Sequence, residues 1–245
     1  MRYSASMRIS LVIPAYNEEE RLRPFLDTIA SYNQRHQREI REVIVVDDGS
    51  SDNTVRVAES YKRRIPSLRV LKHDQNRGKG AAVQTGVKAA KGEAVVFMDA
   101  DGATPIGELP KMDAALQTSD IGVGNRWMKG AQAQRHSLLR SFSGWTYRSY
   151  MSLFRLKGID TMCGFKGYRI DVARTLFKDL IEDRWLFDTE VAYKAVRRGY
   201  SIDNFPIRWT SKDGSKLPTK TLIKSAFQIW PLIRKVKKQE RGIIK

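Results

Sequence analysis

Two pairs of acidic residues stand directly after short apolar runs of the sequence. Asp99 and Asp101 flank Ala100 after one run, and Asp47 and Asp48 follow another. An unbroken apolar run is typical of a strand covered on both faces, and sheets of such strands bind ligands at their carboxyl ends. Carboxylates there predict a Mg²⁺ or Mn²⁺ ion shared with substrate phosphates, or hydrogen bonds to a base or ribose. The alternative is turn and helix-capping chemistry.

Two other motifs occupy similar positions. The run PAYNE at residues 14–18 closes the first apolar segment, where a plain strand-to-helix turn is the alternative. The run NRGKGAA at 76–82 has glycines that permit close backbone approach, and its cations, Arg77 and Lys79, could meet a diphosphate. It matches neither a Walker A motif nor a G-x-G-x-x-G motif, because Val83 stands where the latter needs glycine.

The elements that must position these motifs alternate between strand and helix. Apolar runs predict strands at residues 9–14, 43–46, 68–71, 94–98 and 120–123, and helices at 18–32, 52–64, 79–90 and 107–116. Asp52 can cap the second of these helices. This repetition predicts an α/β fold with a mostly parallel sheet and helices on both faces.

The second half of the chain is less regular. We expect an aromatic-rich helix at 137–156, strands at 164–169 and 202–209, and a helix at 188–198. Residues 219–245 mix apolar and basic residues and predict an amphipathic C-terminal extension. The remainder, residues 1–218, is expected to form one compact domain.

Charge is distributed unevenly along the 245 residues. The chain has 44 Lys and Arg against 27 Asp and Glu, a net charge of +17. Residues 1–120 hold 18 basic and 17 acidic residues, whereas residues 121–245 hold 26 and 10. The second half is therefore expected to meet a polyanion or a membrane surface. A nucleic-acid-binding protein is the remote alternative, but no recognised nucleic-acid motif is present. The single cysteine, Cys163, excludes a disulfide framework and a Cys-based zinc site.

The sequence predicts peripheral rather than integral membrane association. No stretch approaches 18 uncharged apolar residues, so no transmembrane helix is expected. The extension can lie among lipid headgroups on the cytoplasmic side of a membrane. Aromatic residues that could join it, or could instead be core, are Trp127, Trp145, Tyr147, Tyr150 and Phe154.

Taken together, the motifs resemble those of family-two glycosyltransferases, which have the GT-A fold. The most specific runs are DADGAT at 99–104, GNR at 124–126, DTMCGFK at 160–166, WLFDTE at 185–190 and GSK at 214–216. Within that family the chain is similar to the polyprenyl (dolichyl) phosphate hexosyltransferases. Ala103 stands where mannosyl relatives often have a glutamine ligand, which favours the glucosyl branch.

The resemblance implies a division of labour among residues. Residues 1–120 would hold the nucleotide sugar and residues 121–218 the acceptor. Asp99 would hold ribose or metal, Asp101 would be the main metal ligand, and Asp47 would contact the base. The other expected nucleotide-sugar residues are Pro14, Tyr16, Glu18, Asp48, Arg77, Lys79 and Ala100. The expected acceptor-phosphate residues are Arg126, Arg140, Ser143, Lys166 and Lys216.

The implied reaction is metal-dependent, inverting transfer of glucose from UDP-glucose to a polyprenyl phosphate. A phosphate monoester is largely ionised at neutral pH, so the acceptor needs cations more than a base. Asp160, Asp188 and Glu190 are further catalytic candidates, with a base role if the acceptor is a hydroxyl and a structural role otherwise. The alternative is the same fold with GDP-mannose or UDP-GlcNAc as donor, or a sugar hydroxyl as acceptor.

Overall fold

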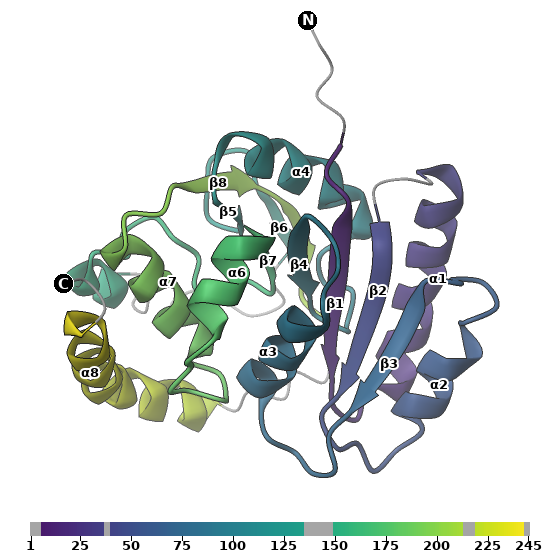
Figure 1. The fold of residues 1–245 in the computed structure, drawn as a ribbon, viewed down its shortest axis with the longest axis horizontal. Coiled ribbons are helices and arrows are strands. Elements are labelled where there is room, and N and C mark those ends of the chain that lie inside the picture. The colour runs from purple at the N-terminus through teal and green to yellow at the C-terminus, as the bar shows by residue number, and fades with distance from the viewer. Residues whose placement is uncertain (1–5, 37–39, 135–148, 213–218, 243–245) are drawn as a thin grey trace, which may run out of the picture.

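The computed structural model describes residues 6–36, 40–134, 149–212 and 219–242, and their main feature is a twisted sheet (Figure 1). Seven strands lie in the order β3-β2-β1-β4-β7-β5-β8. Their bounds are β1 Ile9–Ala15, β2 Ile40–Asp47, β3 Leu68–Lys72, β4 Ala94–Met98, β5 Ile121–Asn125, β7 Phe165–Arg169 and β8 Ile202–Pro206. A separate parallel pair joins β6, Gln132–Gln134, to β9, Arg208–Thr210.

The sheet is parallel except for β7, which runs antiparallel to both of its neighbours, β4 and β5. Met98 at the end of β4 faces Phe165 at the start of β7. The predicted, mostly parallel sheet is therefore confirmed. The reversal has a consequence for chemistry, because it brings the first residues of β7 to the edge where β1, β2 and β4 end.

Helices cover both faces of the sheet, as predicted (Figure 1). Their bounds are α1 Glu19–Arg35, α2 Thr54–Ser60, α3 Lys79–Ala89, α4 Leu109–Thr118, α6 Ile170–Phe177, α7 Phe187–Arg197 and α8 Thr219–Arg241, with 3-10 turns η1 Ile106–Glu108 and η2 Ser152–Phe154. One apolar core joins the sheet to α1, α2 and α4. The other joins the sheet to α3, α6, α7 and α8.

The alternation of side chains in β1 shows how one strand serves both cores. Ile9, Leu11 and Ile13 enter the first core, and Val12 enters the second. All four are fully buried. A strand covered in this way must be apolar at every position, which is why it reads as an unbroken run in the sequence.

Glycines let α4 pack closely on the sheet. A Cβ atom added at Gly122 in β5, or at Gly167 in β7, would lie 2.5 Å from the Met112 sulfur. Real Cβ atoms essentially never show that distance, so a larger residue at either position would force the Met112 side chain of α4 to move.

The C-terminal helix α8 docks on the domain through its apolar face. Ile229, Leu232 and Val236 are buried in the second core. Glu240 accepts two hydrogen bonds from the Arg198 guanidinium, at 2.6 and 2.7 Å. Across the described residues, none of the helices is both long enough and apolar enough to cross a bilayer.

The element boundaries differ from the predictions mainly where helices are short. The helix expected at 52–64 ends at Ser60, and the one expected at 107–116 opens as the 3-10 turn η1. The two-turn helix α6 and the three-residue strand β6 were not predicted, because so few residues carry too little periodicity. Most of the helix expected at 137–156 lies outside the described residues.

The buried Glu42 in β2 links three neighbouring segments of the chain. Its carboxylate accepts hydrogen bonds from Ser10 Oγ (2.8 Å), the Lys91 amide (2.6 Å) and Arg69 Nη1 (2.7 Å). Burial raises the pKa of Glu42, but the hydrogen bonds from Arg69, Ser10 and Lys91 together outweigh it, so the pKa lies below its usual 4.5.

We predict that Glu42→Gln lowers the free energy of unfolding by about 1–3 kcal/mol at neutral pH. A carboxylate with a lowered folded-state pKa stabilises the protein above its unfolded pKa and loses that effect as the pH falls through the folded value. The difference in unfolding free energy between Glu42→Gln and wild type should therefore become smaller at acidic pH. Urea unfolding at several pH values measures it, with Glu93→Gln at a largely exposed ion pair as control. A difference in unfolding free energy that does not change with pH would contradict the lowered pKa of Glu42.

Candidate active site

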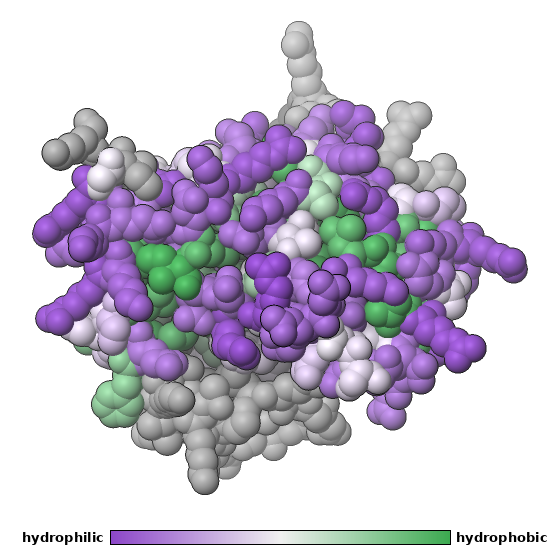
Figure 2. Space-filling model, turned by 60° about the horizontal axis from the view of Figure 1, so that its bottom comes forward, coloured by the Kyte–Doolittle hydropathy of each residue, from purple (hydrophilic) through white to green (hydrophobic). Residues whose placement is uncertain are grey.

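Most of the described residues predicted to carry chemistry gather at the carboxyl-end edge of the sheet. In Figure 1, β1 and β2 run toward the lower end of the molecule. Figure 2 turns that end forward and shows a mostly hydrophilic surface interrupted by separate hydrophobic areas.

Asp99, the first residue after β4, is paired with Lys79 at the start of α3. The Lys79 ammonium lies 2.5 Å from Asp99 Oδ1. Burial raises the pKa of Asp99, but the Lys79 charge and hydrogen bond lower it further, so the net pKa lies below its ordinary value. Gly164 lies against the Asp99 carboxylate, and any side chain there would displace it.

Asp101 has the opposite electrostatic situation. Burial, followed by repulsion from Asp99, raises the pKa of the Asp101 carboxyl. One of its oxygens accepts a hydrogen bond from the Ala103 amide at 2.9 Å. Two neighbouring acids whose charges repel fit a divalent cation, which would relieve the repulsion.

The donor set fits a cation that shares its ligands with substrate. Asp99 and Asp101 offer hard oxygen ligands, and the described residues contain no cluster of three or more His, Cys, Asp or Glu side chains able to hold a metal. Mg²⁺ typically uses one or two carboxylates and completes its shell with water and phosphate oxygens.

Asp47, the last residue of β2, is buried and only partly satisfied. Its Oδ2 accepts a hydrogen bond from the Ser50 amide at 3.2 Å. Its Oδ1 is buried and has no hydrogen-bond partner within the described structure. A buried acceptor without a donor costs about 1–3 kcal/mol, so this oxygen is suited to an N–H group of a ligand.

Asp48, in contrast, is used to build the site. Its two oxygens accept hydrogen bonds from the backbone amides of Arg77 (2.9 Å) and Gly78 (2.7 Å), and His73 Nδ1 lies 2.7 Å from Oδ1. The carboxylate thereby fixes the loop that leads into α3 and places Lys79. The Arg77 side chain is exposed.

The loops after β1 and β2 are joined to each other. The Asn17 amide donates to Ser50 Oγ (2.9 Å), and the Ser51 amide donates to Asn17 Oδ1 (2.8 Å). The positive φ of Asn17, 51°, aims it at the second loop. Sequence reasoning missed this residue, although asparagine adopts the left-handed region more readily than most residues. Pro14 is the second-last residue of β1, just before this junction.

Two predicted nucleotide-pocket residues lie on the same loop. Tyr16 is partly exposed, and Glu18 binds the Arg21 guanidinium through both oxygens at 2.7 Å. Ala100, between the two acids, is buried and joins the first apolar core.

Next to β5, the partly buried Arg126 forms a bidentate pair with the buried Asp160. Arg126 Nε and Nη2 donate to the two Asp160 oxygens at 2.8 and 2.9 Å. The guanidinium also lies over the Trp209 ring, 5.1 Å from its centroid. Burial raises the pKa of Asp160, but the Arg126 charge more than offsets this and leaves the pKa lowered. Asp160 therefore orients Arg126.

Lys166 and Asp188 form a second buried pair. Lys166 Nζ lies 3.2 Å from Asp188 Oδ1 and donates to the Cys163 carbonyl at 2.5 Å. Burial raises the pKa of Asp188, and the Lys166 and Lys79 charges only partly offset this. Because β7 is antiparallel, Lys166 joins the edge formed by the other strand ends.

Glu190 has a different role from Asp188, although only one residue separates them. Its carboxylate accepts hydrogen bonds from the amides of Ile181 (2.9 Å) and Glu182 (2.8 Å) and pairs with Lys194 at 2.6 Å. All of Glu190 is buried. The arrangement fixes the loop that precedes α7.

That same loop, residues 180–186, covers the amino end of α3. The carbonyls of Arg184 and Asp183 accept hydrogen bonds from the amides of Gly80 (3.2 Å) and Ala81 (3.0 Å). A Cβ atom at Gly80 would lie 2.8 Å from the Glu182 carbonyl oxygen. The glycines of the 76–82 run thus allow residues 180–186 to approach closely. On this loop, the centroid of the Trp185 ring lies 5.7 Å from Lys79 Nζ.

Three predicted acceptor residues, Arg140, Ser143 and Lys216, are outside the described residues.

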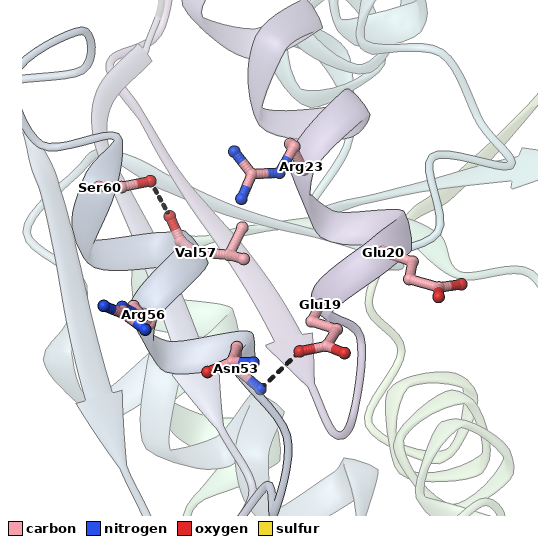
Figure 3. A pocket seen from close by; sticks show the side chains of 7 residues that line it. All are labelled: Glu19, Glu20, Arg23, Asn53, Arg56, Val57 and Ser60. Carbon is pink, nitrogen blue, oxygen red and sulfur yellow. Dashed lines mark hydrogen bonds between the residues drawn. The ribbon is translucent and has the colours of Figure 1, made fainter.

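One feature of the described surface lies apart from the cluster. A surface groove between α1 and α2 is lined by polar and charged side chains, including Glu19, Arg23 and Arg56 (Figure 3). It contains none of the predicted site residues.

Comparison with known proteins identifies the family. The sequence profile described as Glycosyl transferase family 2 matches residues 10–177. The chain belongs to this family. It is therefore a glycosyltransferase, as the strand-end motifs predicted.

Curated relatives share about a third of their residues with this chain. It is 35% identical to "Dolichyl-phosphate beta-glucosyltransferase ALG5C" of Trichomonas vaginalis over 90% of this chain and 69% of the relative. It is 37% identical to "Dolichyl-phosphate beta-glucosyltransferase" of Drosophila melanogaster, over 87% and 70%. The human protein of that name is 36% identical over 87% and 71%.

Solved structures share the fold at lower identity. A Mycobacterium tuberculosis glucosyl-3-phosphoglycerate synthase has a TM-score of 0.71 at 20% identity, covering 95% of this chain and 81% of the other. The same synthase in complex with Mn²⁺ and UDP-glucose gives a TM-score of 0.70, covering 95% and 79%. These likenesses confirm the GT-A fold predicted from the sequence.

Glu190→Gln tests the separation of roles between the two acids of α7. We predict that it lowers the free energy of unfolding by about 3 kcal/mol, because it leaves Lys194 buried without its counter-charge. Urea unfolding measures this. Glu59→Gln, at an exposed pair with Lys62, should change the value by less than about 0.5 kcal/mol. Wild-type stability combined with complete loss of turnover would instead make Glu190 catalytic.

Proposed function

We propose that this glycosyltransferase moves glucose from UDP-glucose to a dolichyl-type polyprenyl phosphate at a membrane surface, with Mg²⁺ or Mn²⁺. One observation carries the proposal: Asp47, Asp99 and Asp101 stand at one edge of the sheet, with the partly buried Lys79 paired to Asp99 and the buried Lys166 paired to Asp188 at the same edge. The name that these relatives share, dolichyl-phosphate beta-glucosyltransferase, supports the sugar and the lipid acceptor. The synthase structures with UDP-glucose support the donor.

The nucleotide sugar would occupy the half formed by residues 1–120. The unpartnered Asp47 oxygen would accept a hydrogen bond from the uracil N–H, between the joined loops that carry Pro14, Tyr16 and Glu18. The diphosphate would lie near Lys79. When bound at Asp99 and Asp101, the divalent cation would supply Lewis-acid stabilisation of the diphosphate leaving group.

The acceptor phosphate would approach from the half formed by residues 121–218. Arg126 and Lys166 are held there by Asp160 and Asp188. Arg140, Ser143 and Lys216 are proposed to join them. A phosphate oxygen would form a bond to the anomeric carbon as the bond from that carbon to the UDP oxygen breaks, and the configuration would invert. Since the nucleophile is already ionised, the protein need only position it.

Asp188 favours one alternative acceptor. Its raised pKa would suit a general base for a sugar or glycerate hydroxyl. The similar synthase has been crystallised with phosphoglyceric acid, which presents a hydroxyl. In our main proposal, Asp188 is a positioning residue for Lys166. Comparing phosphate and hydroxyl acceptors separates the two functions.

The proposal predicts that purified protein moves label from UDP-glucose into the organic phase when given polyprenyl phosphate and a divalent cation. Asp101→Asn should reduce the rate at least about a thousandfold, because it removes a carboxylate needed at the leaving group. A chelator should act similarly. Asp171→Asn, at an exposed acid of α6, is the matched control and should leave the rate unchanged. Full activity of Asp101→Asn, or in chelator, would refute the metal role.

Asp47→Asn tests base recognition. The amide can place an N–H group where the buried oxygen accepts, so we expect the affinity for UDP to fall about tenfold or more, corresponding to loss of one buried hydrogen bond. Isothermal titration with UDP and GDP measures it. A variant that binds UDP as wild type does would show that Asp47 does not face the base.

A further inference from the structure

Three apolar side chains form an exposed patch on the side of the molecule that carries α8. Exposure reaches 72% for Leu153, 79% for Phe227 and 52% for Trp230. Phe227 and Trp230 lie three residues apart on α8 and so share a face. The Trp230 ring contacts the ring of Phe154, 5.9 Å between centroids, and Phe154 is the neighbour of Leu153 in η2. We call these three residues the α8 patch.

Basic residues follow the α8 patch along its helix, and α8 has no exposed acid. Glu240 is the single acid of α8, and it is buried against Arg198. Among the α8 side chains that the structure describes, the exposed basic residues are Arg234, Lys235, Lys237, Lys238 and Arg241, and those next to η2 are Arg155 and Lys157. The Arg234 guanidinium lies over the Trp230 ring, 5.3 Å from its centroid.

We propose that the α8 patch inserts into the headgroup region of a bilayer containing anionic lipid, and that the surrounding cations hold α8 parallel to that surface. The inference rests on the proposed function in one respect: a lipid-borne acceptor requires the enzyme to work at a membrane.

The physical properties of the patch fit a bilayer better than a protein. Aromatic and aliphatic tips flanked by Lys and Arg are the pattern of helices that lie in a membrane interface. Each basic residue near an anionic surface adds electrostatic attraction to it. A stable dimer buries about 800 Å² on each partner, which three side chains cannot supply.

The buried face of α8 also relates the patch to the site. Ile229 and Val236 share the second core with Leu186 and Phe187, which immediately precede Asp188. Figure 1 shows α8 in the lower part of the molecule, at the end toward which β1 and β2 run. Docking on α8 would therefore keep the acceptor half close to the headgroups.

Flotation of the full chain with lipid vesicles tests the inference. Wild type should float with vesicles of phosphatidylcholine and phosphatidylserine, and salt should weaken its binding. The double variant Leu153→Gln/Phe227→Gln should partition at least about tenfold less, since it removes both fully projecting apolar tips. Met128→Gln, at a 44% exposed side chain outside the patch, is the matched control and should float as wild type does.

Transfer to a short-chain, water-soluble polyprenyl phosphate separates this inference from the proposed function. The double variant should keep the wild-type rate with that acceptor. If wild type floats with vesicles but transfers no glucose to either acceptor, the proposed function is refuted, whereas the membrane role of the α8 patch is supported.

Other results would overturn the patch assignment. These are equal flotation of wild type and double variant, no flotation of wild type, or loss of the soluble-acceptor rate in a folded double variant. A wild-type dimer in sedimentation that the double variant abolishes would assign the patch to a second copy instead.

Discussion

The contact between Lys79 and Asp99 organises the chemistry of this protein. The Lys79 ammonium lies 2.5 Å from a carboxylate oxygen at the end of β4, so positive charge is held at the sheet edge where the acids gather. The pair is built from three sides. Asp48 fixes the loop that delivers Lys79, Gly164 leaves room for Asp99, and the 180–186 loop caps the helix that begins at Lys79. A change in any of these would shift the ion pair.

The other charged residues of the site are held by their neighbours. Asp101 is repelled by Asp99, Lys166 pairs with Asp188, and Asp160 holds Arg126. Within a low-dielectric interior such pairs maintain fixed orientations at little reorganisation cost, which is the arrangement that stabilises developing charge. The raised pKa values of Asp101 and Asp188 and the lowered values of Asp99 and Asp160 follow from how closely each acid is compensated.

The same residue types perform structural and chemical tasks here, and position in the sequence does not separate them. Asp47 and Asp48 are adjacent, yet Asp47 has a buried oxygen without a hydrogen-bond partner among the described residues, whereas both oxygens of Asp48 accept hydrogen bonds from backbone amides. Asp188 pairs with Lys166, whereas Glu190, two residues further along α7, accepts hydrogen bonds that fix the preceding loop. In each case the decision depends on which amides and cations the fold brings within hydrogen-bond distance.

The sequence by itself determined the sheet and the acids at its edge. Strands such as β4 are apolar at every position because both faces are covered, and that continuity is visible in the chain without any tertiary knowledge. The fold decided the reversed direction of β7, which brings Lys166 to the acids. It also decided that Gly80 packs against the backbone of residues 182–184, and that Phe227 is exposed on α8. These depend on contacts between residues tens of positions apart, and local periodicity carries no record of such contacts.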